Sequence, residues 1–223
     1  MDKEYWQARW QTPDIKFNQN KPNAFLLQYI PALNLSPNAT VFVPLCGKSI
    51  DMVWLAAQGY RIVGVEFSPQ ACQMFYQENK LPFQTEETER FTVFKGDKIT
   101  LYCGDFFDLT PAMLGKIAAI YDRAALVALP SDLRTKYARH LLNLSPLKIQ
   151  ILLITLSYEP TQMPGPPFSV DEQEVKTLYD KPCHIQTLYN APAQEIAPHL
   201  QAKGLKQAQE QVFLITKNSA FNP

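Results

Sequence analysis

The feature that most constrains the fold is a strand–turn–helix pattern that occurs twice in succession. Residues 41–45 form an apolar run rich in branched side chains, typical of a buried parallel strand, and a turn at 46–49 and a helical pattern follow it. A second apolar run at 61–65 leads to Ser68-Pro69, where Ser suits a helix N-cap and Pro suits the first helical position. Because parallel strands need such crossover helices, the pattern predicts an α/β fold with a parallel sheet.

Further strands and helices continue this alternation. Hydrophobic patterning predicts a hairpin with its turn at Gly96-Asp97, followed by apolar strands and amphipathic helices. The predicted strands are 91–94, 99–103, 117–121, 149–156, 185–189 and 211–216, and the predicted helices include 69–79, 131–142 and 193–203. With 223 residues, no internal repeat and no evident linker, the chain is predicted to be a single domain, 1–223.

Composition and charge exclude several classes of protein. Lys and Arg number 21 and Asp and Glu number 21, so a formal net charge of zero gives no attraction to nucleic acid or to an anionic membrane surface. No apolar stretch reaches the about 18 residues of a membrane span, and the N-terminus lacks the apolar segment of a signal peptide. The 4 cysteines and 3 histidines are scattered, without the spacing of a disulfide framework or a metal site. We therefore expect a cytoplasmic protein that acts on a small molecule without a metal. Since no coiled-coil pattern stands out either, we expect a monomer.

A turn with one glycine limits which nucleotides could bind. Ligands of open α/β sheets bind beyond the carboxyl ends of the strands, and Gly47-Lys48-Ser49 follows the first strand there. The tripeptide resembles the end of a phosphate-binding loop, but residues 42–46 contain no Gly, so the backbone cannot wrap a phosphate. The three glycines of a dinucleotide fingerprint are also missing. The sequence therefore disfavours a nucleotide hydrolase.

Acidic residues follow the next strands. Glu66 lies 19 residues after Gly47, where a carboxylate can accept hydrogen bonds from both hydroxyls of a ribose. Asp105 is placed for an adenine edge, and Phe106 could offer its ring face or its amide. Equally, Asp105 could be an ordinary turn residue and Glu66 a solvated loop residue. A ribose site without phosphate contacts suggests S-adenosylmethionine, whose sulfonium is a good leaving group for a nucleophile aligned with the methyl carbon.

Several stretches resemble those of thiopurine S-methyltransferases, including the bacterial members, and they follow the family's order from about residue 5 to 170. These stretches are Trp6-Gln7 to Trp10, Val43-Pro44-Leu45-Cys46-Gly47-Lys48-Ser49, Ile62-Val63-Gly64-Val65-Glu66, Leu101-Tyr102-Cys103, Asp122-Arg123-Ala124-Ala125-Leu126-Val127-Ala128, Leu156-Ser157-Tyr158-Glu159-Pro160 and Pro164-Gly165-Pro166-Pro167-Phe168. The combination is specific to the family, while the C-terminal fifth is less diagnostic.

The resemblance implies a class I S-adenosylmethionine-dependent methyltransferase fold, a mostly parallel seven-stranded sheet with helices on both faces. It implies S-adenosyl-L-methionine as cofactor, S-adenosyl-L-homocysteine as product, and a segment 1–22 that covers both the cofactor and the substrate. The implied cofactor contacts are Trp10, Leu45, Glu66 and Arg123, with Trp6, Gly47, Asp105 and Phe106 close by. It places Phe17 in the substrate pocket, and Arg123 toward the substrate as well.

Some of these roles have alternatives. Trp6 and Trp10 could instead anchor the N-terminal segment to the core, and Arg123 could be an ion-pair partner of Asp122. Asn18 stands where the family usually has His, so no imidazole base is available at that position. Asp122 is a weaker candidate for the catalytic proton acceptor, or an orienter of Arg123.

The expected reaction is methyl transfer to a soft nucleophile, foremost the sulfur of aromatic or heterocyclic thiols such as thiopurines. Aromatic thiols are acidic enough to be partly ionised near neutral pH, so a strong general base is not required. Two alternatives stay open: methylation of selenium or tellurium oxyanions or another small thiol, and a regulatory protein that binds the cofactor without turnover.

Overall fold

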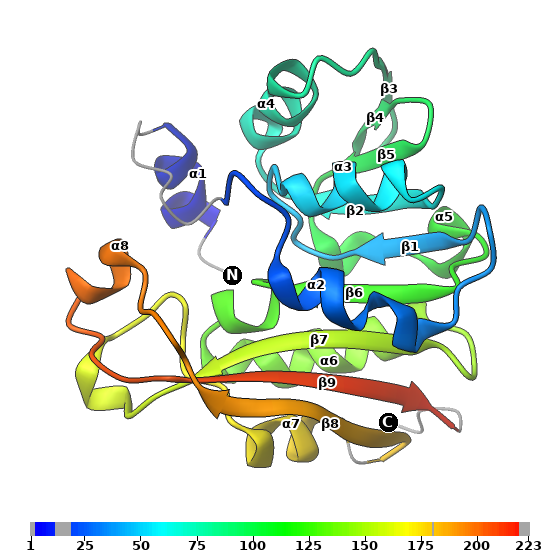
Figure 1. Ribbon diagram of the computed structural model, residues 1–223. Coiled ribbons are helices and arrows are strands. Elements are labelled where there is room, and N and C mark those ends of the chain that lie inside the picture. Colours follow the sequence, from blue (N-terminus) through cyan, green and yellow to red (C-terminus); the bar gives the residue numbers. More distant parts are fainter. Residues whose placement is uncertain (1–2, 12–18, 180, 219–223) are drawn as a thin grey trace. The chain divides into compact units, whose positions relative to one another are not determined.

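The computed structural model describes residues 3–11, 19–179 and 181–218 (Figure 1). These residues divide into two compact units. Of the described residues, the first unit comprises 3–11, 19–28 and 34–120, and the second comprises 29–33, 121–179 and 181–218. The division falls inside strand β6 (Ala119–Arg123), so this strand begins in the first unit and ends in the second.

Parallel strands form the centre of the first unit. β1 (Thr40–Val43) pairs in parallel with β2 (Arg61–Glu66) and with the start of β6, and β2 pairs in parallel with β5 (Ile99–Cys103). Two antiparallel strands, β4 (Thr92–Lys95) and β3 (Gln84–Glu87), extend the order to β3-β4-β5-β2-β1-β6. Because Glu66 is paired with Cys103 at the last position of both strands, the carboxyl ends of β2 and β5 lie at one level.

Side-chain caps start the two main helices of the first unit. Ser49 caps α3 (Ile50–Ala57) by accepting from the Asp51 amide, and Ser68 caps α4 (Pro69–Glu78) by accepting from the Ala71 amide. Figure 1 shows α3 along one face of the strands of this unit. The remaining elements are α1 (Lys3–Gln11), α2 (Ala24–Tyr29), the 3-10 turn η2 (Phe106–Asp108) and α5 (Pro111–Leu114).

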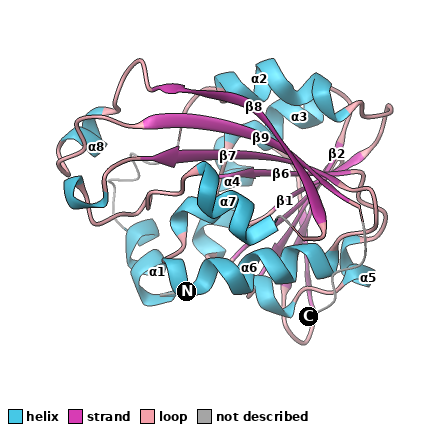
Figure 2. Cartoon of the chain, turned by 90° about the horizontal axis from the view of Figure 1, so that it is seen from below, coloured by secondary structure: helices cyan, strands magenta, loops and turns pink. Residues whose placement is uncertain are grey.

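The second unit is antiparallel. β9 (Gln209–Lys217) lies between β7 (Gln150–Ser157) and β8 (Cys183–Pro192) and runs antiparallel to both. Figure 2 shows α6 (Ser131–Leu144) and α7 (Glu172–Tyr179) along the same face of these strands. The shorter elements are η1 (Ile30–Leu33), η3 (Leu126–Ala128), η4 (Pro160–Gln162) and α8 (Pro198–Gln201).

The predicted alternation of strands and helices is confirmed, with two corrections. Nine strands, not seven, are assigned in the described residues, and they include β3, whose four side chains are all exposed and therefore carry no periodic apolar signal. The predicted helix 193–203 is wrong, because the Ala193 amide donates to the Ala208 carbonyl, which continues the hairpin pairing past Pro192. Helix forms only at Pro198–Gln201, where Pro occupies the first turn.

Lys217 at the end of β9 holds the C-terminus of α6. Its Nζ donates to the carbonyls of Leu142 and Ser145, both at 2.7 Å, and the residue is 5% exposed. The last carbonyls of a helix have no partner within the helix, and a cation there also interacts favourably with the helix dipole. This contact ties α6 to the strand that ends the described chain.

Replacing Lys217 with Met should lower the free energy of unfolding by about 1–3 kcal/mol, because the buried Ser145 carbonyl loses its donor and the Leu142 carbonyl keeps only the Ser145 amide. Chemical denaturation of the two proteins measures this difference. Lys206→Met removes an exposed lysine and should change stability by less than about 0.5 kcal/mol. Equal losses in both variants would contradict the assigned role of Lys217.

Candidate functional site

The carboxylate of Glu66 joins the turns that follow two neighbouring strands. Its Oε2 accepts from the Gly47 amide at 2.9 Å, and its Oε1 accepts from the Ser68 amide at 2.8 Å. Glu66 is 7% exposed, and burial raises the pKa of this carboxyl, while the amides of Ser68, Gly47 and Phe67 act in the opposite direction. The side chain is therefore held as an acceptor at the carboxyl end of β2, and it is not a solvated loop residue.

Trp10 packs against the turn after β1, which contains Gly47, a hydrogen-bond partner of Glu66. Leu45 and Gly47 both have positive φ, at 43° and 52°, so the backbone turns sharply between β1 and α3. A Cβ on Gly47 would lie 3.0 Å from Cζ2 of Trp10, which means that the indole packs directly on the turn. Trp10 is 4% exposed, so its side chain is buried.

The rest of the Gly47-Lys48-Ser49 motif has structural partners. Lys48 is buried, and its Nζ lies 2.6 Å from both carboxylate oxygens of Glu78 at the end of α4. The Ser49 hydroxyl caps α3. Neither side chain is thus held for a phosphate or a magnesium ion, which agrees with the absence of the glycines that a phosphate loop requires.

Asp105 and Phe106 lie next to Glu66. The Gly104 amide donates to the Glu66 carbonyl at 2.9 Å, so the turn after β5 starts beside the end of β2. Asp105 Oδ1 accepts from the Phe107 amide at 3.0 Å and caps η2, which makes it a turn residue in this structure. The Phe106 ring is 1% exposed and packs edge-on against Phe107, so its face is not offered to a ligand.

Three buried cysteines surround this corner, which the sequence did not indicate. Cys46 precedes Gly47, Cys103 ends β5, and Cys72 on α4 is hydrogen-bonded to Cys103. Burial, followed by the charge of Glu66, raises the pKa of the Cys46 thiol. In the sequence, these three cysteines look like ordinary core residues. Only the fold shows that they lie around Glu66 and make its surroundings weakly polar.

In the second unit, Asp122 is a fully buried carboxylate near the end of β6. Tyr137 on α6 donates to its Oδ2 at 2.7 Å, and the Leu126 amide donates to its Oδ1 at 3.2 Å. Burial raises the pKa of Asp122 to about 6, against the lowering effect of Tyr137 and of the amides of Leu126 and Ala125. Its oxygens therefore hold the turn that follows Arg123 and the first half of α6.

Within the first unit, the structure brings several residues of the predicted set together. The turn with Leu45 and Gly47 contacts Trp10 and Glu66, and Asp105 lies beside them, whereas Arg123 and Asp122 belong to the other unit. Arg123 is partly exposed, and Trp6 on α1 is partly buried. Phe17 and Asn18 lie outside the described residues.

Within the described ranges, no group of three or more His, Cys, Asp or Glu side chains is arranged to hold a metal ion. In the same ranges, none of the helices has the length and apolar character needed to cross a membrane.

Solved structures identify the fold. A structure from work on the conversion of a disulfide bond into a thioacetal group in echinomycin biosynthesis has a TM-score of 0.68, with 12% identity over 97% of this chain and 93% of that one. The magnesium protoporphyrin IX methyltransferase of Synechocystis, solved with bound S-adenosylhomocysteine, has a TM-score of 0.65, with 12% identity over 98% and 100%. The chain therefore has the class I fold of S-adenosylmethionine-dependent methyltransferases, as predicted.

Sequence comparisons then give the family. The family model described as thiopurine S-methyltransferase matches residues 1–218. A thiopurine S-methyltransferase of Nitrosospira multiformis is 44% identical over 220 residues, covering 99% of this chain and all of that protein. One of Pseudomonas fluorescens is 40% identical over 215 residues, covering 96% and 99%. The chain belongs to the thiopurine S-methyltransferase family, so it is an S-adenosylmethionine-dependent methyltransferase, and the predicted family and cofactor are confirmed.

The burial of Asp122 predicts a pH effect on stability. Because its pKa is higher in the folded protein, near 6, than its usual 3.8, folding favours the protonated form, and stability falls as pH rises through this window. Between pH 5 and pH 8, the wild type should lose about 1 kcal/mol of unfolding free energy relative to Asp122→Asn.

Denaturant unfolding of both proteins at several pH values measures this loss. Asp132→Asn, which changes an exposed carboxylate at the start of the same helix α6, is the control. The prediction fails if the gap between wild type and Asp122→Asn is the same at pH 5 and pH 8.

Proposed function

We propose that this protein transfers the methyl group of S-adenosylmethionine to the sulfur of aromatic or heterocyclic thiols such as thiopurines. The observation that carries the proposal is the buried Glu66 carboxylate, held by the amides of Gly47 and Ser68 at the carboxyl end of β2. The names of the relatives supply the class of acceptor. When bound, the cofactor supplies an electrophilic methyl group on a sulfonium that leaves easily.

The residues of the first unit suit an adenosine without phosphates. An ionised carboxylate has about four acceptor sites, and the amides of Gly47 and Ser68 each donate to a different oxygen, so the carboxylate can still accept from the hydroxyls of a ribose. Trp10, packed on the Gly47 turn with Leu45, would cover the cofactor, and Trp6 on the same helix would lie close by. Asp105 would face the adenine with its carboxylate, and Phe106 would contribute its backbone rather than its buried ring.

The remaining roles concern the acceptor. Arg123 would bind the carboxyl group of the cofactor and stabilise an anionic thiolate, and Phe17 would line the substrate pocket. The buried carboxylate of Asp122, bonded to Tyr137, would orient the turn after Arg123 rather than take the proton. A thiol that is already partly ionised needs no base here, which suits Asn18 at the position of the family histidine.

We further propose that both units form one methyltransferase domain, since the family model spans 1–218. A monomer in the cytoplasm that binds no nucleic acid is the simplest arrangement. The formal net charge of zero and the four cysteines, all buried as free thiols, support it.

Glu66→Gln should weaken the binding of S-adenosylhomocysteine by about tenfold or more. The glutamine side chain lacks the negative charge that strengthens the hydrogen bonds donated by the ribose hydroxyls. Isothermal titration calorimetry measures the affinity. Glu89→Gln changes an exposed glutamate and should leave the affinity as it is. Equal affinities in the wild type and Glu66→Gln would remove the ribose role from Glu66.

Turnover of a labelled methyl group tests the acceptor. The wild type should methylate an aromatic thiol such as a thiopurine with a higher kcat/KM than selenite, tellurite or an aliphatic thiol, since the aromatic thiolate forms near neutral pH. Preference for an oxyanion would assign the protein to metalloid detoxification instead. Tight cofactor binding without turnover of any of them would favour a regulatory protein.

A further inference from the structure

One buried guanidinium in the second unit joins three segments that are distant in sequence. Arg134, in the first turn of α6, is 4% exposed. Its Nε donates to the Leu129 carbonyl at 2.8 Å, and its Nη1 donates to the Ser169 carbonyl at 3.1 Å. Nη1 also lies 2.6 Å from each carboxylate oxygen of Glu174 in the first turn of α7.

This arrangement depends on the shape of arginine. A buried charge must be paired and fully hydrogen-bonded, and Glu174, whose side chain is 30% exposed, supplies the opposite charge. The guanidinium presents several donors in one plane, so it can reach two carbonyls and a carboxylate together, whereas the ammonium of lysine is a single point. Arg134 is therefore a specific link between segments, and a solvated helix residue would not need such partners.

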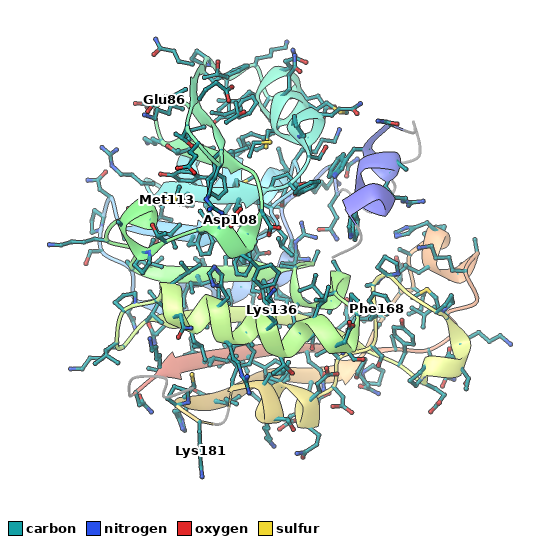
Figure 3. All side chains as sticks on the ribbon, turned by 180° about the vertical axis from the view of Figure 1, so that it is seen from behind. Glu86, Asp108, Met113, Lys136, Phe168 and Lys181 are labelled. Carbon is teal, nitrogen blue, oxygen red and sulfur yellow. The ribbon has the colours of Figure 1, made fainter. Side chains whose placement is uncertain are left out.

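The two carbonyls belong to the loops that follow β6 and β7. Leu129 ends the turn that begins after Arg123, and Ser169 ends the proline-rich loop after β7. These loops also contact each other, because the Phe168 amide donates to the Val127 carbonyl at 2.6 Å. The Phe168 ring lies 5.8 Å from the guanidinium, beside one end of α6 (Figure 3).

Hydrogen bonds between Tyr158 and Ser169 join the two ends of the proline-rich loop, so a displacement of Ser169 would displace the whole loop. The Tyr158 amide donates to the Ser169 hydroxyl, which donates back to the Tyr158 carbonyl at 2.7 Å. The Tyr158 hydroxyl donates to the Pro167 carbonyl at 2.6 Å. At Gly165, φ is +78° and a Cβ would lie 2.5 Å from the Phe168 ring, so the loop is folded tightly.

We infer that Arg134 is a positioning residue for the methyl acceptor. By holding Leu129 and Ser169, it fixes the turn after Arg123 against the loop 158–169. The inference rests on the proposed function, in which Arg123 faces the acceptor as well as the carboxyl group of the cofactor. Two other residues assigned to the cofactor, Glu66 and Trp10, belong to the first unit, outside the segments that Arg134 joins. The loss of Arg134 should therefore weaken the binding of the cofactor less than the binding of the acceptor.

Steady-state kinetics with an aromatic thiol, together with calorimetry for S-adenosylhomocysteine, tests this role. Arg134→Met should raise KM for the thiol by about tenfold and change the affinity for S-adenosylhomocysteine by less than about threefold. Arg134→Lys keeps the positive charge but not the planar set of donors of the guanidinium, so it should give an intermediate KM. Arg139→Met, on the same helix but exposed, should match the wild type. An unchanged KM, or a loss of cofactor affinity as large as the rise in KM, would overturn the inference.

Hydrogen exchange gives a readout that does not need turnover. Amides of 158–170 should exchange at least about tenfold faster in Arg134→Met than in Arg139→Met, because the loop loses its anchor. If Arg134→Met does not fold, Arg134→Lys is compared in the same way. A wild type that methylates no thiol would refute the proposed function while its exchange pattern still tests the link. Equal exchange in the two variants would refute the link itself.

Discussion

The first unit depends on the bonds that the Glu66 carboxylate makes to the amides of Gly47 and Ser68. One side chain thereby fixes the turn that enters α3 and the turn that enters α4. Burial disfavours its ionised form, and the amides favour it, so the carboxylate is costly to keep unless each oxygen has a donor. An acceptor that is both buried and satisfied is rigid, and rigidity at the strand ends is what a ligand of defined shape requires.

The same reasoning separates a motif from its environment at Gly47-Lys48-Ser49. A lysine that binds a phosphate must project into a loop lined by free amides. Here the amide of Gly47 donates to Glu66, and the ammonium group of Lys48 donates to Glu78. The tripeptide is used to join β1, α3 and α4. Its chemistry is decided by the residues before it, where the absence of further glycines leaves the turn short and fixed.

Much of this could be predicted from the sequence, and the exceptions have physical causes. The run from β1 to α4 was predictable because apolar periodicity, two serine caps and Pro69 agree locally. Glu66 was predictable because a parallel strand has a defined end. Tyr137 and Arg134 were not, because a polar residue on an amphipathic helix looks the same whether it faces water or a buried partner 15 or more residues away. The strand β3 was missed because none of its side chains is buried.

In the second unit, α6 is the element on which the loops depend. Tyr137 holds Asp122 near the end of β6, and Arg134, one helical turn away, holds Leu129 at the end of the turn that follows. The helix is in turn anchored at its C-terminus by Lys217, from the last strand. The C-terminal fifth of the chain carries few recognisable motifs, yet its strand fixes the helix that fixes the loops. The turn after Arg123 and the loop around Pro164–Phe168 are therefore held in part by Tyr137 and Arg134, which lie in none of the family motifs.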